Sequence, residues 1–534
     1  MDAVRKAYDA FLLRFPLCHE MWNKYVKLEA HAGTNKEQEV YGRAVASAPY
    51  SVDIWVSYCQ YLISSCGMPD LIRREIEKGL CYVGTNYNSN ILWDEFIKFE
   101  KFHKEWSRVA DIYARMIQHP IHQLRFYHEC LQDCIEMHKS DIPNYSNFLA
   151  SDSKVSIAFK NAEKLDQKIK CFEQAMTTKC FSFKPLSDAE IKNWHDYLDF
   201  MQSQGDIHQV YKLYERCLVV CASYSEFWMR YVIFLRRQGR IELANDALSR
   251  ATDVFVKKDK SIHLFSAWFK EFNGDVGGAR EGYQYVYSKL CPGMVHAIVK
   301  LANLERRQQG KEHGCSIYEN TIDEEKQKKQ SKILPSLMVE YIRYIFLVCR
   351  DGINAKEMLR VLLLQCECLT NQNLEDIIDL ETKIPGIKHI ELVAGAVEKF
   401  LETESTQQAS EMCDKEHISS ILIKFLERYG SQQLQLLKKA ESRHRRMFWC
   451  KCKISYPSLK RKAVDLGDKP LKVRRSDEQE LPPVAKDHHS KPQAVPLLNT
   501  YDNLKFRSTN EQAHDDQSKP HGLAMLAGTY DDSD

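Results

Sequence analysis

The sequence has no long apolar run and no recognisable catalytic motif. No uninterrupted apolar stretch approaches the roughly 18 residues that span a bilayer, so we expect no membrane partner. The 18 cysteines are scattered without C-x-x-C spacing and follow no recognisable secretory signal. We therefore expect reduced thiols rather than disulfides or zinc ligands. Because no H-E-x-x-H set and no Ser-centred elbow occurs either, we expect a protein that is not an enzyme, has no cofactor, and has no catalytic, cofactor-binding or metal-ligating residues.

Two features that resemble sites are interpreted as structural. The stretch Gly274–Gly278 reads GDVGG, but it lacks the Lys-Ser/Thr and the preceding strand of a phosphate loop. It is predicted to be a turn between helices. Four histidines fall at predicted helix edges or turns and are expected to be structural: His19, His103, His119 and His122.

What the sequence does contain is one pattern repeated at intervals of about 34 residues. Trp194 is followed 11 residues later by Gly205, and Trp228 by Gly239 at the same distance. A fixed period of this length predicts helical hairpins that bury their apolar faces against their neighbours. The residues expected to define the repeats are Trp22, Trp55, Trp93, Trp194, Trp228, Trp268, Tyr25, Tyr58, Tyr197 and Tyr231. Because they recur at positions that face the partner helix, we expect core packing rather than stacking on nucleotide bases.

The copies fall into two groups, with a less regular stretch between them. We predict an N-terminal array over 1–135, a helical connector over 136–185, a C-terminal array over 186–445 and a disordered tail, basic and then acidic, over 446–534. Within these, one long helix is expected over 155–176, a charged loop over 324–332, and less regular helices over 374–384, 390–402 and 418–442.

Charged residues recur within the copies as well. The set comprises Glu29, Glu100, Glu215, Arg216, Arg250 and Arg280. We expect them to join neighbouring helices rather than to bind phosphate. Since single surface ion pairs contribute little stability, their value would lie in setting the register between repeats.

One exposed basic segment stands out from this scaffold. Between residues 441 and 475 there are twelve Lys and Arg against three acids. Its two clusters, Lys460-Arg461-Lys462 and Lys472-x-Arg474-Arg475, match a two-part nuclear import signal. The alternatives are contact with RNA through counterion release and a merely solvated tail. We favour import and hence the nucleus.

The repeats depart from the ordinary tetratricopeptide pattern, which places a small residue four positions after its Trp. These positions hold Val26, Cys59, Ile97, Leu198 and Val232. Together with the aromatic-Glu-Arg pattern, this resembles the half-a-tetratricopeptide (HAT) repeat of RNA-processing scaffolds. The stretches FPLCHEMWNKYVKLE, ILWDEFIKFE and IYARMIQHP, with a connector before a second array, resemble the pre-mRNA-processing factor 39 family.

That resemblance implies an all-α solenoid of HAT hairpins in two arrays. It also implies a non-catalytic nuclear scaffold in pre-mRNA splicing, associated with U1 snRNP proteins and 5′ splice-site selection, including alternative splicing. Family members dimerise through the C-terminal array, so a homodimer or a heterodimer with a paralogue is expected, with contacts in 337–442. The family usually carries sequence ahead of the first repeat, which suggests an N-terminally shortened isoform.

Two other functions stay open at this point. One is a HAT scaffold of the mRNA 3′-end cleavage machinery, which shares the repeat type. The other is a cytosolic, tetratricopeptide-like adaptor that binds a peptide in its groove.

Overall fold

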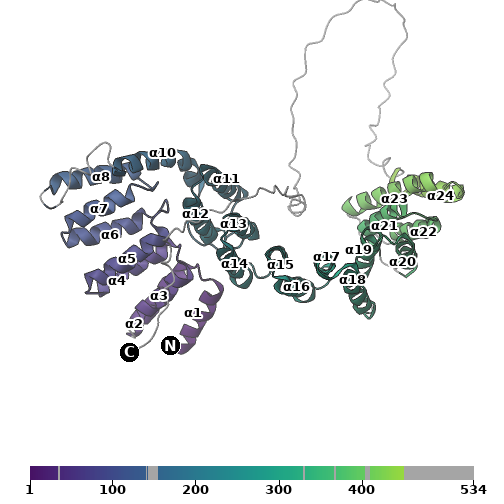
Figure 1. Ribbon diagram of the computed structural model, residues 1–534, viewed down its shortest axis with the longest axis horizontal. Coiled ribbons are helices and arrows are strands. Elements are labelled where there is room, and N and C mark those ends of the chain that lie inside the picture. Colours follow the sequence, from purple (N-terminus) through teal and green to yellow (C-terminus); the bar gives the residue numbers. More distant parts are fainter. Residues whose placement is uncertain are drawn as a thin grey trace, which may run out of the picture. The chain divides into compact units, whose positions relative to one another are not determined.

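Helices make up every regular element of the described chain. The computed structural model describes residues 1–33, 36–139, 141, 154–328, 331–365, 369–402 and 409–449. Within these ranges consecutive helices pack as hairpins on their neighbours (Figure 1), which confirms the predicted all-α solenoid. No described helix is long and apolar enough to cross a bilayer. The tail predicted over 446–534 begins too early, since residues 446–449 are still helical, and from 450 onward it lies outside the described residues.

The N-terminal helices form stacked hairpins, α2/α3, α4/α5 and α6/α7, with α1 and α8 at either end (Figure 1). Proline and glycine shape the turns: Pro69 starts α5, and Gly33 ends α2 in the left-handed conformation. The helices are α1 Asp2–Arg14, α2 His19–Ala32, α3 Glu37–Ser47, α4 Val52–Ser65, α5 Pro69–Val83, α6 Asn90–Phe102, α7 Trp106–Met116 and α8 Leu124–Met137.

The long helix expected over 155–176 is confirmed as α10, Lys154–Ala175. It packs on α11, where the Phe172 ring stacks on the Tyr197 ring with centroids 5.0 Å apart. The helix predicted as a connector therefore contributes to the hydrophobic core that begins the second set of hairpins.

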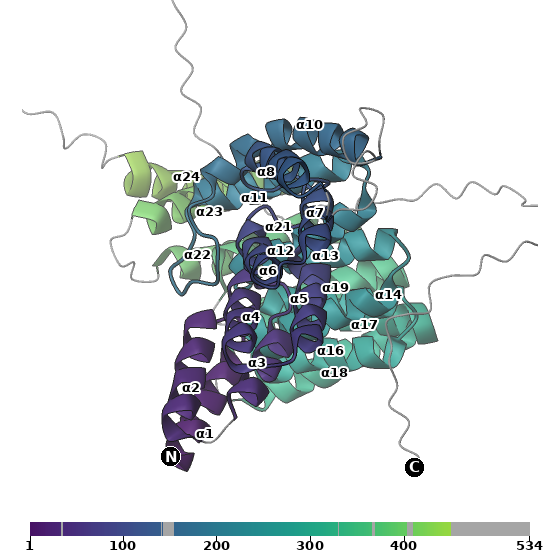
Figure 2. The same ribbon diagram turned by 90° about the vertical axis from the view of Figure 1, so that its left-hand side faces the viewer.

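The remaining helices continue the stack (Figure 1), and most of them are also labelled in the second view (Figure 2). Four of them end in a widened π-helical turn, which extends α14, α16, α19 and α24 by five residues each. The bounds are α11 Asp188–Gln204, α12 Ile207–Val220, α13 Ser225–Arg237, α14 Ile241–Arg250, α15 Lys260–Phe272, α16 Val276–Tyr285, α17 Val295–Gln309, α18 Lys311–Lys326, α19 Leu334–Tyr344, α20 Gly352–Gln365, α21 Asn371–Lys383, α22 Ile390–Glu402, α23 Ala409–Tyr429 and α24 Leu434–His444.

The GDVGG stretch is a turn between helices, as predicted. Gly274 has φ 86°, a conformation that side chains other than hydrogen disfavour. Asp275 then caps α16, because its carboxylate accepts a hydrogen bond of 2.8 Å from the Gly278 amide.

Two local predictions are wrong. The helix expected over 418–442 is broken into α23 and α24. At the break, a β-carbon on Gly430 would lie 2.6 Å from the Leu426 carbonyl oxygen, so only glycine fits this helix end. The loop expected over 324–332 is shorter than predicted, since α18 runs to Lys326 and the buried Glu325 accepts hydrogen bonds from Lys328 and Ser331.

Candidate functional site: the joints between repeats

Five of the six repeat tryptophans lie in the core. Trp22, Trp55, Trp93, Trp194 and Trp228 are each at most 2% exposed. Four of their indole N–H groups donate to a carbonyl oxygen in the turn before their own helix, at 2.8 to 3.0 Å. The repeat tyrosines are buried as well, namely Tyr25, Tyr58, Tyr197 and Tyr231. These rings therefore specify the hairpin and are not available for stacking on a nucleotide base.

Trp268 occupies a different place from the other five. It is only partly buried, and Arg236 of the preceding hairpin lies 5.8 Å from its ring centroid. The residue 34 positions after Trp228 is Ile262, which is fully buried in α15. Ile262 therefore takes the position that the sequence pattern assigned to an aromatic residue in this copy.

An arginine on the second helix of a hairpin covers the tryptophan on the first. The distances from guanidinium carbon to ring centroid are 5.7 Å for Arg43 over Trp22, 5.4 Å for Arg115 over Trp93, 5.6 Å for Arg216 over Trp194 and 5.4 Å for Arg250 over Trp228. Such cation–π contacts are stabilising when the cation is partly desolvated. Each arginine stands 21 or 22 residues after its tryptophan, a constant spacing that the hairpin geometry sets.

Buried glutamates then join one hairpin to the next. The ion pairs are Arg5–Glu29 at 2.8 Å, Arg73–Glu100 at 2.7 Å, Arg216–Glu173 at 2.6 Å, Arg250–Glu215 at 2.7 Å and Arg280–Glu305 at 2.5 Å. All five glutamate side chains are at most 7% exposed. The prediction that the recurring Glu and Arg residues join neighbouring helices is confirmed.

Glu215 shows how such a buried carboxylate is satisfied. It accepts two hydrogen bonds from Arg250, at 2.9 and 2.7 Å, and one of 2.7 Å from the Tyr231 hydroxyl. Burial and the Glu215 charge raise the pKa of Tyr231, so the hydroxyl stays protonated and keeps donating. A paired carboxylate of this kind is costly to break but adds little to stability in itself.

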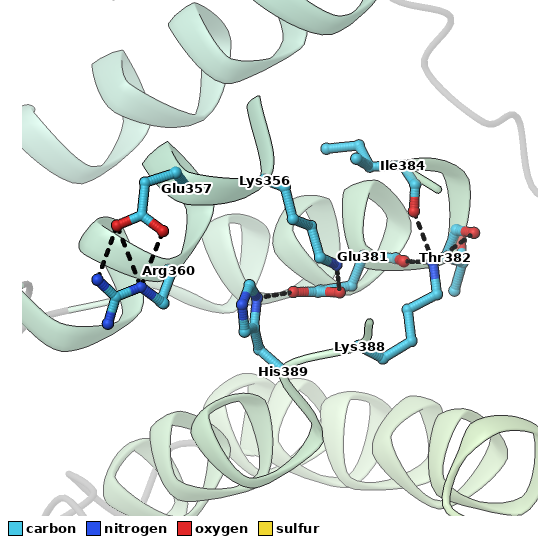
Figure 3. A network of polar contacts seen from close by, with 8 residues as sticks. All are labelled: Lys356, Glu357, Arg360, Glu381, Thr382, Ile384, Lys388 and His389. Carbon is cyan, nitrogen blue, oxygen red and sulfur yellow. Dashed lines mark hydrogen bonds and ion pairs between the residues drawn. The ribbon is translucent and has the colours of Figure 1, made fainter. Parts of the chain in front are cut away.

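A further joint uses lysine and histidine in place of arginine (Figure 3). Glu381 on α21 is fully buried and pairs with Lys356 of α20 and with Nδ1 of His389 at 2.8 Å. Lys388 donates to three backbone carbonyl oxygens at the end of α21, among them that of Ile384 at 2.7 Å. Beside them, hydrogen bonds from Arg360 lower the pKa of the exposed Glu357.

Of the four histidines predicted to be structural, His19 and His119 are partly buried, whereas His103 and His122 are exposed. Cys217 and Cys221 are fully buried, and burial raises the pKa of the Cys217 thiol well above its usual value. Burial also lowers the pKa of His119, and the His103 ring packs on Phe99 at 4.6 Å. Neither the two thiols nor these two histidines are arranged for chemistry.

A polar cavity of about 320 Å³ lies between the N-terminal hairpins and α12. Its lining includes Tyr50, Asp53, His122, Lys179 and Arg216. Arg216 is already paired with Glu173, so the cavity presents Lys179 as its remaining cation. Nothing in this arrangement pairs a nucleophile with a base.

The predicted import signal cannot be placed on this framework. Lys460, Arg461, Lys462, Lys472, Arg474 and Arg475 lie outside the described residues, and their role stays a prediction. The predicted set of recurring charges did not include seven members of the joints, namely Arg5, Arg73, Glu173, Glu305, Lys356, Glu381 and His389. A signal existed for Glu381: it stands seven residues after the buried Leu374, as Glu29 and Glu100 stand seven after Trp22 and Trp93.

The hairpins, their covered tryptophans and the charged joints define a HAT-repeat solenoid, a class of protein whose stacked repeats form extended binding surfaces. Family comparison makes this more specific. Residues 1–133 match the PRP39 N-terminal HAT repeat and residues 167–307 match the PRP39 C-terminal HAT repeat, which together cover about half of the chain. The chain belongs to the PRP39 family.

Individual proteins agree with this assignment. The chain is 30% identical over 490 residues to pre-mRNA-processing factor 39-2 of Arabidopsis thaliana, covering 83% of the chain and 47% of that protein. It is 28% identical over 347 residues to pre-mRNA-processing factor 39 of Schizosaccharomyces pombe, covering 58% and 56%. The chain thus spans about half the length of these relatives.

A solved structure supports the fold alone. The crystal structure of CSTF-77 is similar with a TM-score of 0.57 and 13% identity, covering 84% of this chain and 92% of that one.

Proposed function

We propose that this chain is a non-catalytic scaffold of pre-mRNA splicing. The observation that carries the proposal is the match of both arrays, in order, to the two PRP39 HAT repeat models, with relatives named for pre-mRNA processing. The packing agrees with a scaffold, because five of the six repeat tryptophans are buried in the core. Binding would therefore rely on the outer faces and edges of the hairpins.

Within splicing, the proposed partners are U1 snRNP proteins and the proposed step is 5′ splice-site selection, including its alternative use. The proposed location is the nucleus. The support is the two-part basic signal over 460–475, which would also allow contact with RNA phosphates.

Self-association through the C-terminal array is part of the proposal. The two most exposed large apolar side chains of the described residues are Ile353 at 87% and Ile387 at 89%. Ile353 follows Gly352, and Ile387 lies two residues after Pro385; a β-carbon on Gly352 would lie 3.7 Å from the Pro385 ring, so the two segments that carry these isoleucines are in contact. Adjacent exposed apolar side chains favour an interface, either between two copies or with a paralogue.

The dimer has a sharp test. Changing Ile353→Asp together with Ile387→Asp should shift the full chain from dimer to monomer in sedimentation at micromolar concentration. Phe102→Asp, at a site 83% exposed in the N-terminal hairpins, is the matched control and should leave the dimer intact. A monomeric wild-type protein, or a dimer unaffected by the double change, would rule out this surface.

The function itself is tested by purifying the tagged chain from nuclear extract and identifying the RNA and proteins that accompany it. Enrichment of U1 RNA and U1 proteins is expected. Enrichment of cleavage factors instead would support the 3′-end scaffold. A cytosolic protein that retains its basic segment and carries one defined peptide would support the adaptor.

A further inference from the structure

Three side chains with metal-binding atoms converge from distant parts of the chain. His19 begins α2, Asp53 lies in the first turn of α4, and Cys180 lies in the segment 176–187 between α10 and α11. Their ligand atoms all lie within 4.8 Å of one another. In the part of the chain that the structure describes, no hydrogen bond or ion pair engages any of the three. Asp53 is exposed to solvent and His19 and Cys180 are partly buried, so the cluster is open to an ion from solution.

The position of Cys180 is set by contacts on both sides of it. On one side, the amides of Thr177 and Thr178 donate to the Glu190 carboxylate at 3.1 and 3.0 Å, which fixes the segment to α11. On the other side, the Phe183 ring packs on the Phe15 ring, 5.1 Å between centroids, which fixes it to the end of α1. Cys180 is held between these anchors, so its approach to α2 and α4 follows from packing.

The chemistry of this donor set points to one kind of ion. A thiolate, an imidazole and a carboxylate are the ligands that zinc accepts, whereas calcium and magnesium prefer oxygen alone. Ligand atoms on a tetrahedral zinc ion are roughly 3.3 to 3.8 Å apart, given bonds of about 2.0 to 2.3 Å. Small side-chain rotations would bring the three groups to that separation.

We propose that His19, Asp53 and Cys180 bind one zinc ion, which ties the segment 176–187 to the first two hairpins. Asp53 also lines the cavity of about 320 Å³, so water has access to the fourth coordination position. Lys179 lines the same cavity, and its positive charge opposes the ion and limits the affinity. The site is structural, since it crosslinks three elements that are separate in sequence.

Binding must release a proton. Zinc is bound by the cysteine thiolate rather than by the thiol. The sulfur electron pair forms the bond to zinc and the proton passes to solvent. Apparent affinity should therefore fall as the pH is lowered.

No local spacing in the sequence could have revealed this site. His19 and Asp53 are 34 positions apart, and Asp53 and Cys180 are 127 apart. Asp53 and Cys180 have no other candidate ligand in their own turn or segment, and His19 has only Cys18 and Glu20 beside it. Only the fold brings them together.

The test uses the full chain, stripped with a chelator and titrated with zinc by calorimetry, and with cobalt(II) to observe thiolate-to-metal absorption. The variants are His19→Ala, Asp53→Asn and Cys180→Ser, with Cys171→Ser as the matched control because Cys171 is an exposed cysteine of α10 outside the cluster. Thermal unfolding without metal checks that every variant is folded.

Wild type and Cys171→Ser should bind one zinc per chain. Removing a residue that hydrogen-bonds to a metal ligand already weakens metal affinity by about 10- to 100-fold. Removing a ligand itself should therefore weaken zinc affinity by at least about tenfold. Zinc should also slow hydrogen exchange over 176–187 in wild type and not in Cys180→Ser. The proposal is overturned if wild type binds no zinc, if all variants bind as wild type does, or if only one of the three changes weakens binding.

Discussion

Two ion pairs join the hairpin α4/α5 to the hairpin α6/α7, each through two hydrogen bonds, but they differ in burial. Arg73 holds Glu100 through two hydrogen bonds of 2.7 and 2.9 Å, and Arg115 holds Glu77 through two of 2.6 and 2.7 Å. The Glu100 side chain is 0% exposed and the Glu77 side chain is 39% exposed. Glu100→Gln and Glu77→Gln therefore compare the loss of stability on breaking a buried ion pair with the loss on breaking an exposed one.

The structure sets the expected magnitudes. Removing one partner of a buried pair costs about 3 to 5 kcal/mol, because the other charge is left uncompensated. Arg73 keeps a second partner, Asp70 at 3.0 Å, so the lower end, about 3 kcal/mol, is expected for Glu100→Gln. An exposed pair contributes about 0.2 to 1 kcal/mol, which is the expected loss for Glu77→Gln. The difference of about 2 kcal/mol corresponds to about 30-fold in an opening equilibrium.

Native-state hydrogen exchange is the appropriate assay, because the repeats of a solenoid open with separate free energies. Amides of α5 and α6 should exchange about 30-fold faster in Glu100→Gln than in Glu77→Gln. Replacing both charges by apolar residues, Arg73→Met with Glu100→Leu, should recover part of the loss. Equal effects of the two glutamine variants would refute the idea that buried pairs set the register.

Three further outcomes are expected. Gly79→Ala should lower the thermal unfolding temperature, because its β-carbon would lie 2.9 Å from the buried Trp55 ring and overpacking costs about 1 to 3 kcal/mol. Gly42→Ala is the control. Nothing lies within 4 Å of its β-carbon, so the gain in helix propensity, up to about 1 kcal/mol, should raise the unfolding temperature. Burial raises the pKa of Glu190, but hydrogen bonds from Thr177 and Thr178 outweigh it and lower the pKa to about 2. The stability that the Glu190 carboxylate contributes should therefore be complete above about pH 4.5 and be lost as the pH falls toward 2. Hydrogen exchange over 176–190 should show this pH dependence, and Glu190→Gln should abolish the dependence. Alanine at the six basic residues of 460–475 should leave a fluorescent fusion in the cytoplasm, and an unchanged nuclear signal would remove the import role.

Local periodicity explains what the sequence could predict. A hairpin must place Trp22 or Trp228 toward its partner helix, so the pattern that identifies these residues also determines their burial. Glu29 and Glu100 lie on the same helix as their tryptophan, and Glu215 follows the aromatic residue of the second helix, which is why these charged joints could be anticipated.

Contacts between distant parts of the chain could not be predicted. Tyr50 and Tyr211 hydroxyls lie 2.9 Å apart although 161 residues separate them, and Lys212 donates to the carbonyl oxygens of Cys81 and Tyr82. These contacts depend on the small rotation added at each repeat, which no single repeat encodes. The convergence at Cys180 arises in the same way.

Sequencing of nuclear RNA after rapid degradation of the protein tests the proposed function most directly. The account predicts altered use of 5′ splice sites, with poly(A) site choice unchanged and U1 RNA levels preserved. Shifted poly(A) sites with unchanged 5′ splice sites would contradict it.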